Sequence, residues 1–207
     1  MAVRVFLANQ INSLSILYDV SIITNMQGES NFLDNISDEV DIIHLPIKRN
    51  INLFYDFYVL FLLIILFRKK KFSLVHSISP KAGLLSAIAA WIARIPNRLH
   101  TFTGQVWVTK KGPNRWLLKS LDKLIVMLNT LILVDSISQK EFLINENLIN
   151  LEDALVLGKG SLSGVDLQRF KPSNEKKESL RNKLNISSDD VVFLFVGRIK
   201  KDKGIFE

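Results

Sequence analysis

The residues best suited to hold a ligand lie around a predicted strand–helix–strand unit at residues 72–107. They offer an imidazole, two hydroxyls, an ammonium and a flexible backbone position, and they are His76, Ser79, Lys81, Thr103 and Gly104. In an open parallel sheet the ligand crevice lies outside the carboxyl ends of the strands, so residues that follow two such strands share one rim. Free backbone N–H groups at a helix start, with a lysine beside them, favour an anion. The pattern predicts an anion-binding rim, although a plain helix start and a loop glycine explain it equally well.

The elements of this unit follow from the spacing of its apolar residues. A short apolar run at 74–75 is followed by Pro80, which suits the first helical turn and makes Ser79 the expected N-cap. Apolar residues then recur at helical spacing until Pro96 and Asn97 stop the helix. A second apolar run follows at 99–102.

The rest of the chain repeats this alternation of strands and helices. Apolar runs predict strands at 18–24, 40–45, 131–134, 154–157 and 191–196, and helical spacing predicts helices around 1–17, 51–67, 117–128, 138–143 and 173–185. Ser138 with Glu141 has the spacing of a capping box. We predict an α/β fold with a Rossmann-like parallel sheet covered by helices on both faces. Its first strand is either missing, which we favour, or supplied by the alternating residues 2–7.

The composition of the chain excludes several classes of function. The chain has 207 residues, of which 48% are hydrophobic, so it can bury a core, and it has no cysteine. Disulfides, thiolate metal sites and a cysteine nucleophile are excluded, and without a secretory signal pattern the cytoplasm is the default location. The net charge of +7 suits nucleic acid, an anionic membrane or a phosphate-bearing substrate. Aromatic residues do not interleave with the lysines as stacking platforms would, so we predict no nucleic-acid partner. The glycine spacing at 158–164 does not fit a nicotinamide fingerprint.

The most hydrophobic segment is residues 51–67. It has eleven consecutive apolar residues at 57–67, followed by four basic residues at 68–71. A bilayer span needs roughly 20 mostly apolar residues, and Asp56 interrupts this one, so we do not predict a transmembrane helix. The segment is either a core helix with a solvated basic end or a helix lying in a membrane interface.

Several stretches resemble, in order, bacterial glycosyltransferases of family four, which are retaining enzymes of the GT-B fold. They are H-S-I-S-P-K-A-G-L-L, R-L-H-T-F-T-G-Q-V-W, R-W-L-L-K-S-L-D, L-V-D-S-I-S-Q-K-E-F-L, G-S-L-S-G-V-D-L-Q-R-F-K-P and F-V-G-R-I-K-K-D-K-G. The resemblance implies an acceptor-side domain at 1–165, a linker and helix at 166–190, and the start of a truncated nucleotide-sugar-binding domain at 191–207.

The resemblance also implies roles for particular residues. Gly197, Arg198 and Lys203 would hold the diphosphate of the donor, where fixed cations stabilise the charge of the leaving group without a metal. His76, Ser79, Lys81, Thr103 and Gly104 would line the acceptor side of the cleft. Thr103 stands where many members of the family have a histidine, so the catalytic residues stay unknown. No cofactor is expected beyond the UDP- or GDP-linked co-substrate.

By resemblance, the chain belongs to an enzyme of capsule, O-antigen or other polysaccharide synthesis that moves a hexose from a nucleotide sugar to a lipid-linked glycan. Such enzymes sit on the membrane, so we expect a cytoplasmic protein attached peripherally to the inner face of the cell membrane. We expect residues 1–207 alone to be inactive. The alternatives are a non-catalytic remnant or split subunit that binds lipid-linked glycan, and a GT-B sugar-nucleotide epimerase.

Overall fold

The structure is a computed structural model, and it describes residues 7–25, 35–48, 50–168, 170–197 and 199. The chain divides into two compact units, Met1–Gly164 and Val165–Glu207. The predicted linker at 166–190 and the predicted second domain from 191 stay predictions.

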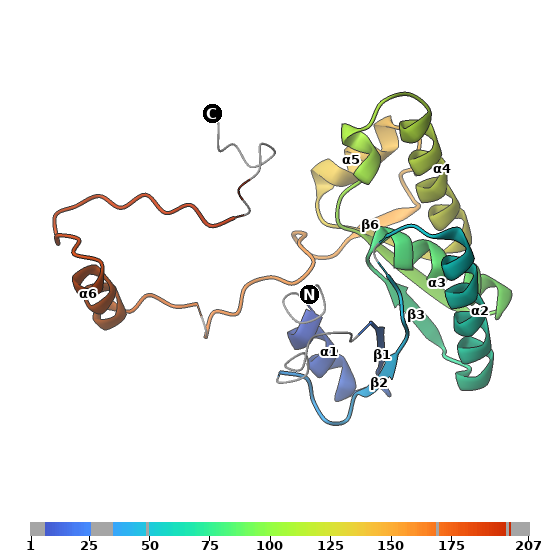
Figure 1. Cartoon of the computed structure of the whole chain (residues 1–207), viewed down its shortest axis with the longest axis horizontal. Helices are drawn as coiled ribbons and strands as arrows, with labels where there is room; N and C mark the ends of the chain where they lie inside the picture. Colours follow the sequence, from blue (N-terminus) through green and yellow to red (C-terminus); the bar gives the residue numbers. More distant parts are fainter. Residues whose placement is uncertain (1–6, 26–34, 49, 169, 198, 200–207) are drawn as a thin grey trace. The chain divides into compact units, whose positions relative to one another are not determined.

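The first unit contains two parallel sheets (Figure 1). In the smaller sheet, β1 (Ser21–Thr24) pairs with β2 (Asp41–His44), and α1 (Ala8–Ser15) precedes both. The larger sheet has the order β3-β4-β5-β6, with all neighbours parallel. Its strands are β3 (Leu74–Ser77), β4 (Asn97–Phe102), β5 (Leu131–Val134) and β6 (Ala154–Val156). The predicted α/β fold with a parallel sheet flanked by helices is confirmed. Most of the alternating segment 2–7 lies outside the described residues, so the missing first strand stays a prediction.

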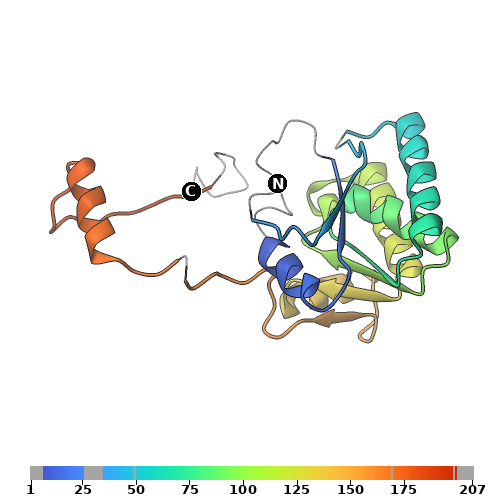
Figure 2. The ribbon, with the colours of Figure 1, turned by 90° about the horizontal axis from the view of Figure 1, so that it is seen from below.

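Helices α2, α3 and α4 form one layer along the larger sheet. Figure 2 shows them side by side, and α3 packs against both of its neighbours. Their bounds, with the other helices of this unit, are α2 (Leu53–Lys70), α3 (Pro80–Ile92), the 3-10 helix η2 (Val106–Thr109), α4 (Gly112–Leu128) and α5 (Ile137–Asn145). One apolar core lies between the sheet and α4, α5 and η2, with Trp107, Ile125 and Leu143 at its centre.

A second apolar core joins the smaller sheet to α2 and α3. Val59, Leu63 and Phe67 of α2 are almost fully buried in it, and Leu45, directly after β2, packs with them. The helix begins at a reciprocal cap, in which the Asn52 side chain accepts from the Tyr55 N–H and the Asp56 carboxylate accepts from the Asn52 N–H. It continues past the predicted end into the basic residues.

The predicted cap of α5 is wrong by two residues. The N-cap is Ser136, whose hydroxyl accepts from the Gln139 N–H, and the Gln139 side chain accepts from the Asp135 N–H at 2.7 Å. Two overlapping pairs in the sequence have the spacing of a capping box, Ser136 with Gln139 and Ser138 with Glu141. The one adjoining the end of β5 forms because it also satisfies the backbone N–H that follows the strand.

In the second unit, α6 (Asn174–Lys183) forms where a charged helix was predicted, with Ser173 as its N-cap. The predicted strand at 191–196 is not formed, and its apolar side chains are at least half exposed, up to 93% for Phe193. A strand needs hydrogen-bonded neighbours, and among the described residues of this unit there is no other strand.

Candidate functional site

The predicted rim lies at the carboxyl edge of the larger sheet. We define the rim as the loops that follow β3 to β6, residues 78–79, 103–105, 135–136 and 157–161. The parallel register aligns Ser77 with His100, Phe102 with Val134, and Val134 with Val156, so these four loops leave the sheet at the same edge. The structure therefore brings Ser79, Thr103 and Gly104 to one edge, as the sequence predicts.

At the start of α3, Ser79 occupies the predicted N-cap position and Pro80 the first turn. The Ser79 side chain is exposed and makes no capping hydrogen bond. The helix therefore starts on backbone geometry, because proline is already suited to the first turn. The Ser79 hydroxyl stays available to a ligand at the rim.

Lys81 is already neutralised by an acidic partner from α2. Its Nζ lies 2.5 Å from Asp56 Oδ1 and also donates to the Asn50 carbonyl at 2.6 Å. Both charged side chains are largely buried, with 20% of Lys81 and 15% of Asp56 exposed. The pair ties the start of α2 to the start of α3. A role for Lys81 in anion binding stays a prediction, and it would require an anion to compete with Asp56.

His76 is hydrogen-bonded to the neighbouring strand. Its Nε2 lies 2.7 Å from Thr101 Oγ1, and burial lowers the pKa of its imidazole. Beside it, Ser77 Oγ lies 2.9 Å from His100 Nδ1. Burial, with a smaller repulsion from His76, lowers the pKa of His100 to about 4. Both imidazoles are therefore neutral near pH 7 and cannot pair with an anion. His100 is only 1% exposed, so it supports the strand rather than contacting a ligand.

Thr103 and Gly104 are the exposed residues of the loop after β4. Gly104 has φ of 124°, a backbone conformation that L side chains rarely adopt, so glycine is required there. Its backbone can approach a ligand closely, and the Thr103 hydroxyl lies beside it. Their predicted contact with an acceptor is untested.

Two rim residues that the sequence did not single out carry buried polar atoms. Gln105 Nε2 and Asp135 Oδ1 are buried without a hydrogen-bond partner in the described part of the chain. Burial raises the pKa of the Asp135 carboxyl. Unpaired buried donors and acceptors are costly and are common where a ligand completes the hydrogen bonds. Their positions in the sequence could have placed them at the rim, because each residue follows the carboxyl end of a strand.

Gly160 fixes the loop after β6 against Asp135. A Cβ at Gly160 would lie 2.4 Å from the Asp135 carbonyl oxygen, and that oxygen accepts a hydrogen bond from the Ser161 N–H at 2.6 Å. The two loops therefore approach backbone to backbone. Asp135 is held at the rim by this contact and by the Gln139 cap.

Trp107 anchors the rim loop in the core. Its side chain is fully buried, its indole N–H donates to Asp122 Oδ2 at 2.8 Å, and its ring stacks on Phe142. Burial raises the pKa of Asp122 to about 6, although the hydrogen bond from Trp107 opposes the shift. Arg115 and Lys119 both lie over the indole and both pair with Glu146. The charges of Arg115 and Lys119 are therefore partly neutralised within the fold.

The predicted donor residues lie in the second unit. Gly197 is exposed, and Arg198 and Lys203 lie outside the described residues. Their predicted grip on a diphosphate therefore stays a prediction.

Helix α2 presents an apolar surface to solvent. Phe54, Phe57, Tyr58, Phe61 and Ile65 are 93%, 68%, 53%, 59% and 48% exposed. We call these five residues the outer stripe of α2, because they recur at helical spacing on the side opposite Val59, Leu63 and Phe67. In the described part of the chain, no helix combines the length and apolarity that crossing a bilayer requires.

Comparison with known proteins agrees with the resemblance. No family model matches the chain. The capsular polysaccharide biosynthesis glycosyltransferase CapM of Staphylococcus aureus is 38% identical over 190 residues, which are 91% of this chain and 48% of CapM. The Escherichia coli UDP-Gal:alpha-D-GlcNAc-diphosphoundecaprenol alpha-1,3-galactosyltransferase is 29% identical over 188 residues, which are 90% of this chain and 47% of that enzyme. The chain thus spans about half the length of these curated relatives. It is a homologue of bacterial glycosyltransferases of polysaccharide synthesis.

Proposed function

We propose that this chain forms the acceptor-binding part of a retaining, metal-independent glycosyltransferase. The reaction would move a hexose from a nucleotide sugar to a lipid-linked glycan at the cytoplasmic face of the cell membrane. The observation that carries this proposal is the 38% identity to CapM across 91% of the chain. The name of the E. coli relative, which acts on a diphosphoundecaprenol-linked GlcNAc, supports a lipid-linked acceptor.

The rim supplies groups suited to a sugar acceptor. The Ser79 and Thr103 side chains are exposed, and Gln105 and Asp135 have buried polar atoms without partners in the described residues. Sugars are recognised through hydrogen bonds to their hydroxyl groups, and a site whose polar atoms are left unpaired by the wrong ligand discriminates strongly. The charge of Lys81 is paired with Asp56, so the rim offers hydrogen-bonding groups rather than a free cation.

The outer stripe of α2 supports peripheral attachment to the membrane. Aromatic and aliphatic side chains of an interfacial helix insert at the headgroup boundary, and basic residues at the same helix meet anionic lipids. The Asp56–Lys81 pair ties the first turns of α2 to the rim. A membrane-bound α2 would therefore hold the rim near the surface where a lipid-linked acceptor presents its sugar.

The test is binding of the purified chain to nanodiscs with and without diphosphoundecaprenol-linked GlcNAc. We expect tighter binding when the acceptor is present, and about tenfold loss of that gain in the variants Gln105→Ala and Asp135→Ala, since each removes one hydrogen bond of about 1.5 kcal/mol. Asp38→Ala, at an exposed position outside the rim, is the matched control. Equal binding to both kinds of nanodisc would overturn acceptor recognition.

Attachment is tested separately. The variant Phe57→Asp/Phe61→Asp should lose binding to plain anionic vesicles, because two charges would enter the headgroup boundary. The matched control Ser179→Asp/Asn182→Asp adds the same two negative charges at exposed positions away from α2. Unchanged vesicle binding by the stripe variant would contradict attachment through α2 and leave acceptor recognition standing.

A further inference from the structure

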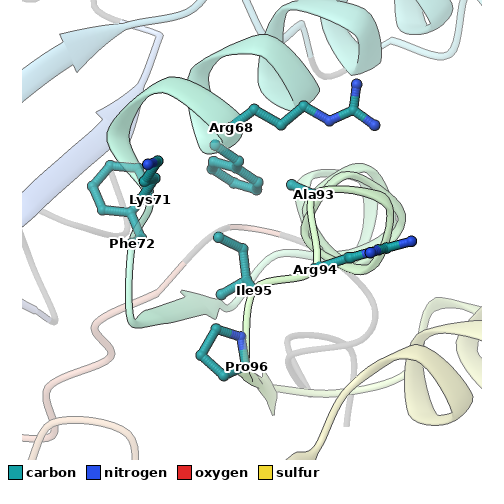
Figure 3. Close-up of a pocket in the computed structure, with 8 residues that line it drawn as sticks. Arg68, Lys71, Phe72, Ala93, Arg94, Ile95 and Pro96 are labelled. Atoms are coloured by element: carbon teal, nitrogen blue, oxygen red, sulfur yellow. The ribbon is translucent and has the colours of Figure 1, made fainter.

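A hollow of about 270 Å³ lies where α2 and α3 end, at the amino edge of the larger sheet and away from the rim. Three cationic residues, Arg68, Lys71 and Arg94, line it together with apolar side chains that include Phe72, Ile95 and Pro96. Figure 3 shows Arg68 and Arg94 extending to the same side, with Lys71 at the other wall and Ile95 and Pro96 between. We call this site the basic hollow.

The three cations of the basic hollow have no acidic partner among the described residues. By contrast, Lys70 pairs with Asp41 and Lys81 pairs with Asp56. Cations that line one hollow repel one another, and an anion that binds among them relieves the repulsion. The basic hollow is therefore a place where an anion gains favourable contacts without displacing a carboxylate.

The backbone at two of these cations is unusual. Lys71 has φ of 51° and Arg94 has φ of 58°, in the left-handed region just past the ends of α2 and α3. Glycine is usual there, and asparagine next, because a Cβ in this conformation crowds the following carbonyl oxygen. The other described non-glycine residues with positive φ are Asn147, Ser161 and Asn185, all with short side chains. The two long side chains in this conformation both line the same hollow.

Attraction to the helix C-terminus is the simpler explanation for a cation at these positions, and it contributes. It accounts for basic residues anywhere in the last turn, where Lys69 and Lys70 already supply them for α2. It does not account for a long side chain at a strained backbone position where glycine is favoured. Strain of this kind is typically retained at binding sites.

We propose that the basic hollow binds the phosphate-bearing headgroup of an anionic membrane phospholipid. Guanidinium and ammonium groups are the side chains that bind phosphate, and the apolar wall can accommodate the glycerol and upper acyl part of a lipid. Arg68 follows Ile65 by three residues and Phe61 by seven, so the hollow adjoins the outer stripe of α2. This inference rests on the proposed attachment of α2 to the membrane. It adds a specific lipid class to that attachment.

The deciding variant is Lys71→Gly/Arg94→Gly. It removes two cations and places glycine where the backbone is left-handed, so the melting temperature should be unchanged or higher while lipid binding falls. The matched control is Lys123→Gln/Lys177→Gln, which removes the same charge from exposed positions outside the hollow and outside α2. On phosphatidylcholine vesicles containing phosphatidylglycerol, the glycine variant should bind at least about tenfold more weakly than the control, because charge-assisted contacts are lost as well as net charge. Equal loss by both variants would overturn the proposal.

A soluble ligand separates the hollow from the membrane surface. Dihexanoyl phosphatidylglycerol below its micellar concentration should bind the wild-type chain more tightly than inorganic phosphate does, and should not bind the glycine variant. Equal affinity for the two ligands would overturn the lipid assignment and make the hollow a phosphate site. If Phe57→Asp/Phe61→Asp keeps vesicle binding while the wild-type chain binds the soluble lipid, attachment through α2 fails and the basic hollow stands. If the soluble lipid does not bind although the stripe variant loses vesicle binding, the basic hollow fails and attachment stands.

Discussion

The cations at the two edges of the larger sheet differ in whether they have an acidic partner. At the carboxyl edge, Lys81 is held by Asp56, and His76 is neutral and bonded to Thr101. At the amino edge, Arg68, Lys71 and Arg94 have no acidic partner in the described part of the chain. The difference teaches that a helix terminus fixes where a cation lies, whereas an acidic residue from a distant segment decides whether its charge is available to a ligand.

The first prediction concerns the stability of the carboxyl edge. Trp107→Ala should lower the free energy of unfolding by about 3–5 kcal/mol, because it removes a fully buried indole and leaves Asp122 without its donor. Urea unfolding measures this. If the edges act independently, the folded variant keeps its affinity for dihexanoyl phosphatidylglycerol. The control is Trp116→Ala, whose side chain is 71% exposed and whose loss should change stability by less than about 0.5 kcal/mol.

The second prediction uses α3, which begins at the rim and ends at the basic hollow. Gly83→Ala should cost about 2 kcal/mol in unfolding free energy, because the new Cβ would lie 2.5 Å from the His100 ring. That ring cannot easily retreat, since Ser77 and Phe102 hold it. A thermal or urea melt checks the loss, and His100→Ser in the Gly83→Ala background should recover part of it. A stabilised Gly83→Ala variant would show that α3 moves freely over the sheet.

The third prediction concerns a variant in which the carboxyl edge, like the amino edge, has a cation without an acidic partner. Asp56→Asn frees Lys81, and it should lower the unfolding free energy by about 1.5 kcal/mol because a largely buried charge loses its partner. Inorganic phosphate should then bind at the rim, observed as new amide shifts at the start of α3 in NMR spectra. Lys81→Gln in the same background should abolish those shifts. Phosphate binding that is the same with and without Asp56 would mean that the ion pair does not mask Lys81.

The fourth and smallest effect is a pH dependence. Folded His100, with its pKa near 4, stays neutral while the unfolded chain takes a proton below about 6.5, so its contribution to stability is lost as pH falls. Asp122 opposes this, because its folded pKa of about 6 lies above the ordinary value of 3.8 for an aspartate, and the folded state therefore gains stability as pH falls through 6. Asp122→Asn removes the opposing contribution. From about pH 7 to about pH 5, the variant should lose on the order of 1 kcal/mol more than the wild type.

Urea unfolding at the two pH values, with wild type and variant side by side, measures that difference. Exposed carboxylates cancel in the comparison because both proteins contain them. An identical pH dependence for the two proteins would contradict the raised pKa of Asp122.

Local features of the fold could be predicted from the sequence, and features that depend on distant partners could not. The start of α3 follows from Pro80 alone, and β4 and β5 follow from their apolar runs. The ion pair of Lys81 joins residues 25 positions apart, and the sequence around Lys81 does not predict Asp56 as its partner. The strand expected at 191–196 has the right local pattern, but without a neighbouring strand among the described residues it has no hydrogen-bonding partner.

The candidate site shows the same limit. The loops that contain Ser79, Thr103 and Gly104 could be placed at one edge because parallel topology requires it. Gln105 and Asp135 were missed because burial without a partner is a property of packing, and a sequence does not display it. The choice of Ser136 over Ser138 as the cap of α5 likewise depends on where β5 ends.

Because its two sheets are separate, the first unit should not unfold as a single cooperative body. No backbone ladder joins β1 and β2 to β3 in the described residues, and the smaller sheet is connected to the rest chiefly through apolar packing on α2. Segments that lack shared ladder bonds can open as separate units. The amide protons of β1 and β2 should therefore exchange with solvent faster than those of β5, which is hydrogen-bonded on both sides.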